Sequence, residues 1–299
     1  MNRRSDLALV VVASLAFATA SPLARIADGL SPIAVGAARC GVAALAIVIV
    51  MPGATAAAIG ALALRLRLAL VGAGLLLALH FALFLGGLAA TSLPAAVALV
   101  SLEPLAVVLA AWIAFGVRPT RREALGIALA TAGAVLVTRG AGEGEHRLLG
   151  DALVLGAVIV YGAYVAAARG LRDAMPAMPY AAAVYGVAFA ALAPIAVAIA
   201  AHDASPPPPT RTWAVVVALG LIPTLIGHTL VQRLSRRGMP ILVALVSSGE
   251  TVGSIAIGAL MLRAWPTRYE WAGTAVVILG ALVAVTGRST TRYENKEPR

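Results

Sequence analysis

The chain has 299 residues, of which 61% are hydrophobic and 12% are charged, and its mean hydropathy is +0.94. A soluble domain carries about 25% charged residues, so this composition excludes a water-soluble protein and indicates an integral membrane protein. The net charge of +10 would suit nucleic acid in a soluble chain. In a membrane protein basic residues mark cytoplasmic loops instead, so no nucleic-acid partner is expected. The single cysteine, Cys40, allows no internal disulfide.

Apolar runs recur along the whole chain, separated by short segments that contain Arg, Pro or Gly. They predict ten spans of a bilayer. The predicted spans are 6–27, 32–51, 68–90, 93–115, 122–138, 150–169, 178–201, 212–232, 239–262 and 269–286. Span 122–138 is short, and without it five arginines of the second half would move to the outer side. The first span also resembles a secretory leader, because Arg3 and Arg4 precede an apolar run and a cleavage-like "ATASPLA".

The basic residues are distributed unequally between the loops. With the N-terminus in the cytoplasm, sixteen Lys and Arg fall on the inner side and six on the outer side, while Arg39 lies within a span. This asymmetry predicts a multi-pass protein of the inner (plasma) membrane with both termini in the cytoplasm.

Two stretches about 147 residues apart, Leu93–Ala134 and Met239–Ala281, are near-copies. Both contain "VALVS", and "PTRRE" in the first matches "PTRYE" in the second. The similarity extends over five spans in each half, and it pairs "AFATASPLAR" with "VYGAYVAAAR", which argues against a cleaved leader. Because five is odd, the second copy enters the membrane from the opposite side. The sequence therefore predicts an all-α membrane protein of two inverted five-helix repeats around a central cavity.

The domain limits follow from the repeat. We expect the first repeat at 1–140, an extracellular linker at 141–149, the second repeat at 150–287 and a cytoplasmic tail at 288–299. Within the spans, Pro22, Pro104, Pro194 and Pro223 each remove a backbone donor and can kink a helix. Gly249 and Gly253 lie four residues apart, which permits close approach of another helix, and ordinary packing explains them equally well.

Five ionisable side chains lie well inside spans: Arg39, His80, Glu103, His228 and Glu250. An ionised group at the middle of a bilayer costs roughly 2.5–3.5 kcal/mol even on the lenient insertion scale. Each of these side chains must therefore face the bundle interior, pair with another group or line a wet cavity.

Each group has two interpretations. Glu103 can bind a substrate amine or a proton, or it can be a neutral carboxyl bonded to backbone that Pro104 has loosened. Glu250 shares a helix face with Ser247 and Ser254, which suits a water-filled cavity. Arg39 can bind a substrate carboxylate through its forked guanidinium, or it can form a structural ion pair with a glutamate.

Further side chains can line a cavity or simply pack between helices. Phe84 lies one turn from His80, and Thr224 lies one turn from His228. The predicted substrate-binding residues are Phe17, Ser21, Arg39, His80, Phe84, Glu103, Tyr161, Tyr164, Thr224, His228, Glu250 and Ser254. No span carries the ligand spacing of a metal site, and no P-loop, dinucleotide or hydrolase motif appears, so no cofactor and no catalytic residue are expected.

The chain resembles ten-helix transporters of the drug/metabolite transporter superfamily, of the EamA type. The similarity rests on the acid-proline pair Glu103–Pro104 in "SLEPL", on "SPIAVGAAR" leading to Arg39, and on "GDALVLGAVIVYGAY" at the start of the second half. Within that superfamily it is most similar to YddG-type exporters of aromatic amino acids. Thr251 follows Glu250, so the second half departs from the acid-proline pair.

The resemblance implies export of small metabolites by alternating access, with amino acids as the expected cargo. It also implies that spans 5 and 10 form a peripheral scaffold or a homodimer contact. Drugs or phosphorylated sugars are alternative cargoes, although only Arg39 is available to bind a phosphate. A membrane-embedded enzyme or receptor would need asymmetric catalytic motifs or a long soluble segment, and the sequence offers neither.

Overall fold

The computed structural model describes residues 3–116, 118–142, 144–167, 171, 174–204, 206–227, 229–231 and 240–286. Every regular element among these residues is a helix. Seven helical stretches are long and apolar enough to cross a membrane, and their bounds are Ala8–Arg25, Pro32–Val50, Leu64–Ala90, Leu93–Phe115, Leu148–Ala167, Ala177–His202 and Thr210–Val231. A shorter apolar stretch runs over Val246–Leu262 within α13 (Pro240–Leu262).

The remaining two spans are α8 (Arg121–Thr138, 18 residues) and α14 (Arg268–Thr286, 19 residues). At a rise of 1.5 Å per residue they reach about 27–29 Å, close to the thickness of a bilayer core. The ten predicted spans are therefore confirmed as helical units. The sequence missed α4 (Ala54–Gly60), a short helix that follows Gly53 at φ +76°. It also placed the start of α5 (Leu64–Ala90) four residues late.

Three of the four predicted proline positions coincide with irregular helix. The first span divides into α1 (Arg3–Ala18) and α2 (Ala20–Arg25) just before Pro22. The fourth divides into α6 (Leu93–Val100) and α7 (Glu103–Phe115) just before Pro104. In the eighth, α11 (Thr210–Leu219) continues as η2 (Gly220–Gly227), a π-helix that contains Pro223. Pro194 is accommodated inside the unbroken α10 (Ala177–His202).

The α8/α14 pair displays the inverted symmetry directly. A Cβ added to Gly126 would lie 2.5 Å from the Gly280 carbonyl oxygen, and one added to Gly133 would lie 2.9 Å from that of Gly273. The sequence repeat relates Gly126 to Gly273 and Gly133 to Gly280, so each contact is the symmetry copy of the other. The order of the contacts makes the two helices antiparallel. A pseudo-two-fold axis relating inverted repeats requires this reciprocity.

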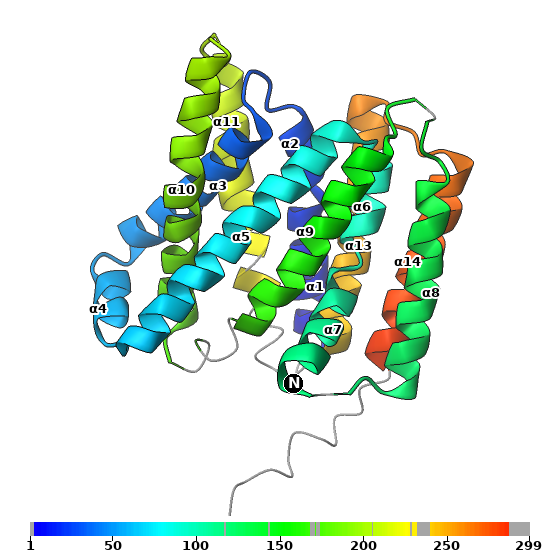
Figure 1. Cartoon of the computed structure of the whole chain (residues 1–299), viewed down its shortest axis with the longest axis horizontal. Coiled ribbons are helices and arrows are strands. Elements are labelled where there is room, and N and C mark those ends of the chain that lie inside the picture. The colour runs from blue at the N-terminus through cyan, green and yellow to red at the C-terminus, as the bar shows by residue number, and fades with distance from the viewer. Residues whose placement is uncertain are drawn as a thin grey trace, which may run out of the picture.

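The other helices pack as two groups. α9 (Leu148–Ala167) contacts α5, α6 and α7, while α1 contacts α13 and η2. Outside these two groups, α3 (Pro32–Val50) packs against α10. In Figure 1, α3, α4 and α10 lie at one side of the molecule and α8 and α14 at the other, with the two groups between them. Each of these groups, like the α8/α14 pair, joins helices of the first repeat to helices of the second.

Small residues hold the second group together. A Cβ on Gly249 would lie 2.5 Å from the Ser14 hydroxyl oxygen, and one on Gly253 would lie 2.6 Å from the Ala18 Cβ. The predicted close approach at these glycines is therefore confirmed, with α1 as the partner helix.

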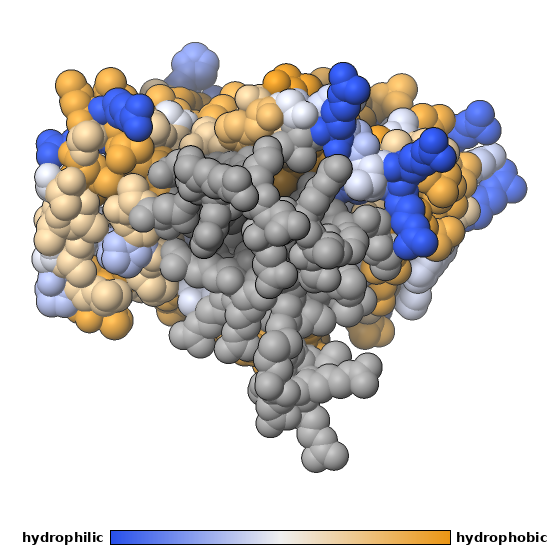
Figure 2. Space-filling model, turned by 90° about the horizontal axis from the view of Figure 1, so that it is seen from below, coloured by the Kyte–Doolittle hydropathy of each residue, from blue (hydrophilic) through white to orange (hydrophobic). Residues whose placement is uncertain are grey.

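The outer surface is apolar, and exposed arginines lie at both ends of the molecule, including the lower end of Figure 1. Leu68, Val71, Leu75 and Leu79 form an exposed stripe along α5, as expected of a helix that faces lipid. Figure 2 views the lower end, where strongly hydrophilic residues lie along the rim of the face. The exposed basic residues at this end are Arg65, Arg67, Arg118, Arg121 and Arg122.

Candidate functional site

Glu103 owes its position to the break between α6 and α7. Pro104 has no backbone N–H, and the Ser101 hydroxyl bonds back to the Ala98 carbonyl at 2.6 Å, so the helix stops and restarts. Glu103 thereby becomes the first residue of α7, where the helix dipole favours a negative charge. Its side chain is 23% exposed.

His80 of α5 lies against this carboxylate. Its Nδ1 is 3.0 Å from the Ala157 carbonyl oxygen of α9, and its Nε2 is 3.7 Å from Glu103 Oε1. A carbonyl only accepts, so Nδ1 carries the proton and Nε2 faces Glu103. The structure thus brings two predicted site residues, from α5 and α7, into a pair.

Arg39 of α3 is held at the π-helical turn. Its Nε donates to the Thr224 hydroxyl at 3.0 Å, and its guanidinium carbon lies 4.4 Å from the centre of the Phe81 ring. Thr224 in turn donates to the Leu219 carbonyl at 2.7 Å, five residues back, and its own carbonyl accepts from Tyr185 at 3.2 Å. Among the described residues, Nε is the only Arg39 nitrogen with a hydrogen bond, and the side chain as a whole is buried.

Glu250 of α13 faces the same interior from the second group of helices. It interacts electrostatically with Arg39, Glu103 and Tyr161. Glu250 therefore links the Arg39 guanidinium of α3 with the Glu103 carboxyl group of α7. Such a set can bind a molecule that carries both charges.

Aromatic rings form one wall of this region. The His80 ring stacks on Phe84 with centroids 6.1 Å apart and lies 5.3 Å from the Tyr161 ring. Tyr161 and Tyr164, which share a face of α9, are 5.9 Å apart. Rings at these separations offer an apolar surface to a flat side chain.

Three predicted site residues lie on α1, α2 or α13 rather than in this charged set. The Ser254 hydroxyl donates to the Ala18 carbonyl at 2.9 Å, and Ser21 is 2% exposed. A Cβ on Gly227 would lie 3.1 Å from the Phe17 ring, which places Phe17 against η2. The remaining predicted residue, His228, lies outside the described residues.

Sequence reasoning missed two members of the site, Phe81 and Tyr185. Phe81 is adjacent to His80 and 4% exposed, and it contributes the ring beneath Arg39. Tyr185 is also 4% exposed and fixes the backbone at Thr224. The adjacency of Phe81 to His80 was a usable signal, whereas the contact of Tyr185 spans 39 residues of sequence.

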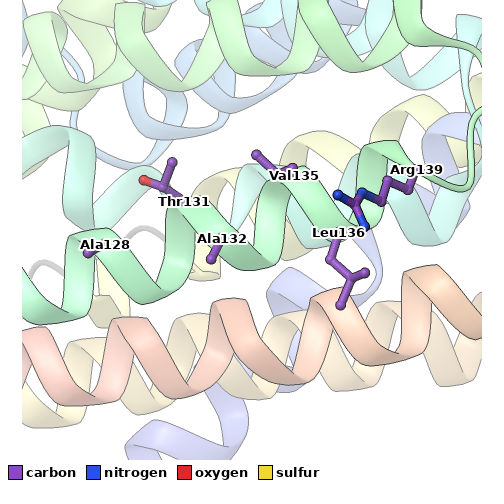
Figure 3. Close-up of a pocket in the computed structure, with 6 residues that line it drawn as sticks. All are labelled: Ala128, Thr131, Ala132, Val135, Leu136 and Arg139. Carbon is purple, nitrogen blue, oxygen red and sulfur yellow. The ribbon is translucent and has the colours of Figure 1, made fainter.

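Two surface pockets lie away from the residues of the candidate site. One, of about 690 Å³, lies along α8 and is lined by Ala128, Thr131, Ala132, Val135, Leu136 and Arg139 (Figure 3). Another, of about 480 Å³, lies over α13 and α14 around Trp265 and Trp271. Both open on the outer, apolar face. Among the described residues no group of three or more His, Cys, Asp or Glu side chains is arranged to hold a metal ion.

Comparison with known proteins agrees with this architecture. The profile of the EamA-like transporter family matches residues 5–139 and 148–286, once for each repeat. A solved structure described only as "Crystal structure of protein" superposes with a TM-score of 0.65 at 21% identity, covering 95% of this chain and 97% of the other. At that identity the likeness concerns the fold alone. No curated protein matches the chain. The chain belongs to the EamA-like transporter family, whose members are membrane transporters of small molecules.

Proposed function

We propose that the protein exports amino acids, aromatic ones foremost, from the cytoplasm across the inner membrane by alternating access between its two repeats. The observation that carries the proposal is Arg39. Its Nε is fixed by Thr224 and its plane is supported by Phe81, so the terminal nitrogens are oriented for a carboxylate.

The rest of the set complements the other parts of such a substrate. Glu103 and Glu250 supply carboxyl groups to which an α-ammonium group can donate. Phe84, Tyr161 and Tyr164 supply a ring-lined surface for the side chain. The direction of export follows from the sequence, in which sixteen Lys and Arg fall on the inner side and six on the outer side, so we assign the lower end to the cytoplasm.

A second candidate cargo is a hydrophobic cation of the drug type. It is favoured by the two acidic side chains of the set, Glu103 and Glu250, of which Glu250 also interacts with Arg39. Such a cargo would depend on the glutamates and would not need Arg39.

Efflux from cells that express the chain tests both candidates. Cells preloaded with labelled amino acids should release phenylalanine or tyrosine faster than cells without the protein. Arg39→Gln should abolish the excess, while Arg65→Gln, which alters an exposed arginine at the start of α5, should retain it. Unaltered efflux with Arg39→Gln would refute the assignment, and resistance to cationic drugs that survives Arg39→Gln would favour the second candidate.

A further inference from the structure

A groove between α13 and α14 opens on the outer, apolar face of the molecule, away from the candidate site. Its volume is about 480 Å³. Ile255, Ala259 and Thr274 are its buried members, and the exposed side chains of Trp265 and Trp271 also line it. Apart from Thr274, the groove therefore offers hydrocarbon and indole surface to the bilayer.

The groove runs along only about half of the two helices. On α13 it extends down to Val252, ten residues before the last residue of the helix, Leu262. On α14 it extends down to Ile278, ten residues after the first residue, Arg268. At a rise of 1.5 Å per residue both distances are about 15 Å, the depth of one leaflet in a hydrocarbon core of about 30 Å. An acyl chain of one leaflet matches this depth, whereas a helix of a second copy would need contact along the full span.

The loop that joins the two helices brings positive charge to the upper end of the groove. Arg263 directly follows α13 and Arg268 begins α14, and both side chains are exposed. The Arg268 guanidinium carbon lies 4.8 Å from the centre of the neighbouring Tyr269 ring. Among the described residues neither arginine forms an ion pair, whereas Arg25 and Arg211 pair with carboxylates. Two guanidinium groups at the edge of an apolar groove suit a phosphate group.

Arg263 adopts a backbone conformation that arginine rarely adopts. Its φ is +54°, in the left-handed region where glycine is usual after the end of a helix. Counted back from the matched "PTR" of the two repeats, its counterpart is Gly116, which follows α7 at φ +67°. The second repeat therefore keeps a strained guanidinium-bearing residue where the first has glycine. Strained positions of this kind cluster at ligand-binding sites.

Thr274 supplies a polar group inside the groove. It is 4% exposed, and its hydroxyl oxygen is buried without a hydrogen-bond partner among the described residues. Thr131 and Thr251, by contrast, donate to the helix carbonyl four residues back. Thr274 lies six residues after Arg268, about 9 Å further down the helix. A phospholipid whose phosphate lies at the arginines carries its ester carbonyls below that level, and such a carbonyl is the acceptor that Thr274 lacks.

We propose that the groove between α13 and α14 binds one anionic phospholipid. An acyl chain lies between the helices, the ester group contacts Thr274, and the phosphate contacts Arg263 and Arg268. Trp265 and Trp271 flank the ester and phosphate, at the depth where indole rings are favoured in membranes. Because we assign the lower end to the cytoplasm, this lipid belongs to the outer leaflet. The site lies outside the proposed transport site and requires no particular cargo.

Thermal unfolding of the purified full chain in detergent tests the inference. Dioleoyl phosphatidylglycerol and dioleoyl phosphatidylcholine carry the same acyl chains and differ in headgroup charge. Phosphatidylglycerol should raise the unfolding temperature, because a ligand of the folded state stabilises it. Phosphatidylcholine should need a concentration at least about tenfold higher, because its choline cation would face two arginines. Glycerol phosphate, the headgroup without acyl chains, should give no shift.

Arg263→Gly separates lipid binding from folding. Glycine relieves the strain at φ +54°, so without lipid this variant should unfold at or above the parent temperature. It should nevertheless need about tenfold more phosphatidylglycerol than the parent for the same shift. Arg139→Gln is the matched control, because Arg139 is also an exposed arginine at the upper end but lies at the end of α8. It should respond as the parent does.

Ala256→Phe fills the groove and should abolish the response to both lipids, since Ala256 lines the groove. Equal stabilisation of the parent by the two lipids, or stabilisation by glycerol phosphate, would overturn the proposal. A parental response in Arg263→Gly would overturn it too. A parent that is dimeric in detergent and becomes monomeric with Ala256→Phe would assign the groove to a second copy instead. If Ala256→Phe does not yield folded protein, the comparison of Arg263→Gly with Arg139→Gln decides.

Discussion

The α8/α14 pair and the α6–α7/α13 pair descend from the same repeat, yet they have diverged to different degrees. α8 and α14 retain reciprocal glycine contacts and matching capping boxes, Thr120 with Glu123 and Thr267 with Glu270. In the other pair, the first copy breaks before Pro104, whereas α13 continues through Glu250 and Thr251. The scaffold has kept its symmetry, and the interior where we propose that the cargo binds has lost it.

The largest effect is expected from breaking the symmetric pair. Gly133→Leu would place a side chain against the backbone N of Val277, 2.7 Å from the new Cβ, and Gly280→Leu would do the same at Ala130. Overpacking against backbone should cost about 3 kcal/mol or more in each variant. The two losses of thermal stability in detergent should be equal, because the contacts are symmetry copies.

Gly72→Leu is the control for this pair, since Gly72 of α5 has open space around its Cβ position. It should unfold at the parent temperature. A large difference between Gly133→Leu and Gly280→Leu would contradict the symmetry of the scaffold.

A smaller effect is expected from copying the first-half break into the second half. Thr251→Pro removes a backbone donor inside α13 and should cost about 3 kcal/mol, the lower limit expected for either glycine variant. Thr251→Ala serves as the control and loses the buried methyl group and the hydroxyl contact to the Ser247 carbonyl, 3.0 Å away, without removing a backbone donor. Thermal unfolding separates the two. A Thr251→Pro variant as stable as Thr251→Ala would mean that α13 tolerates the break, contrary to the divergence described above.

The smallest effect concerns the two capping boxes. Thr120→Val should cost about 1 kcal/mol, the usual value for an N-cap. Thr267→Val should cost more, because the Glu270 carboxylate also lies 3.4 Å from His146 Nδ1. A shift of Glu270 would disturb that contact as well. Equal shifts in the two unfolding temperatures would argue that the contact between Glu270 and His146 adds no stability.

The sequence predicted the ten helices well because a span needs about twenty apolar residues, and uninterrupted runs of that length leave few alternatives. Pro104 located the break in span 93–115, since proline removes the donor that would continue the helix. α4 was missed because Ala54–Gly60 is as apolar as its neighbours and carries no capping side chain that would mark its start.

The site was only partly predictable. Arg39, His80, Glu103 and Glu250 stood out because charge inside a span is costly. Their partners did not, since Arg39 and Thr224 are 185 residues apart and no local pattern records that contact. The burial of His146 was not predicted, because only the fold places the linker that carries it between Asp151 of α9 and Glu270 of α14.

The most direct test of the asymmetric interior is exchange by purified protein in proteoliposomes, comparing phenylalanine with phenylalaninamide, which lacks the carboxylate. The parent and Arg65→Gln should exchange labelled phenylalanine and leave the amide untouched, and Arg39→Gln should exchange neither. Exchange of phenylalanine by Arg39→Gln at the parent rate, or of the amide as readily as the acid, would contradict the role given to Arg39.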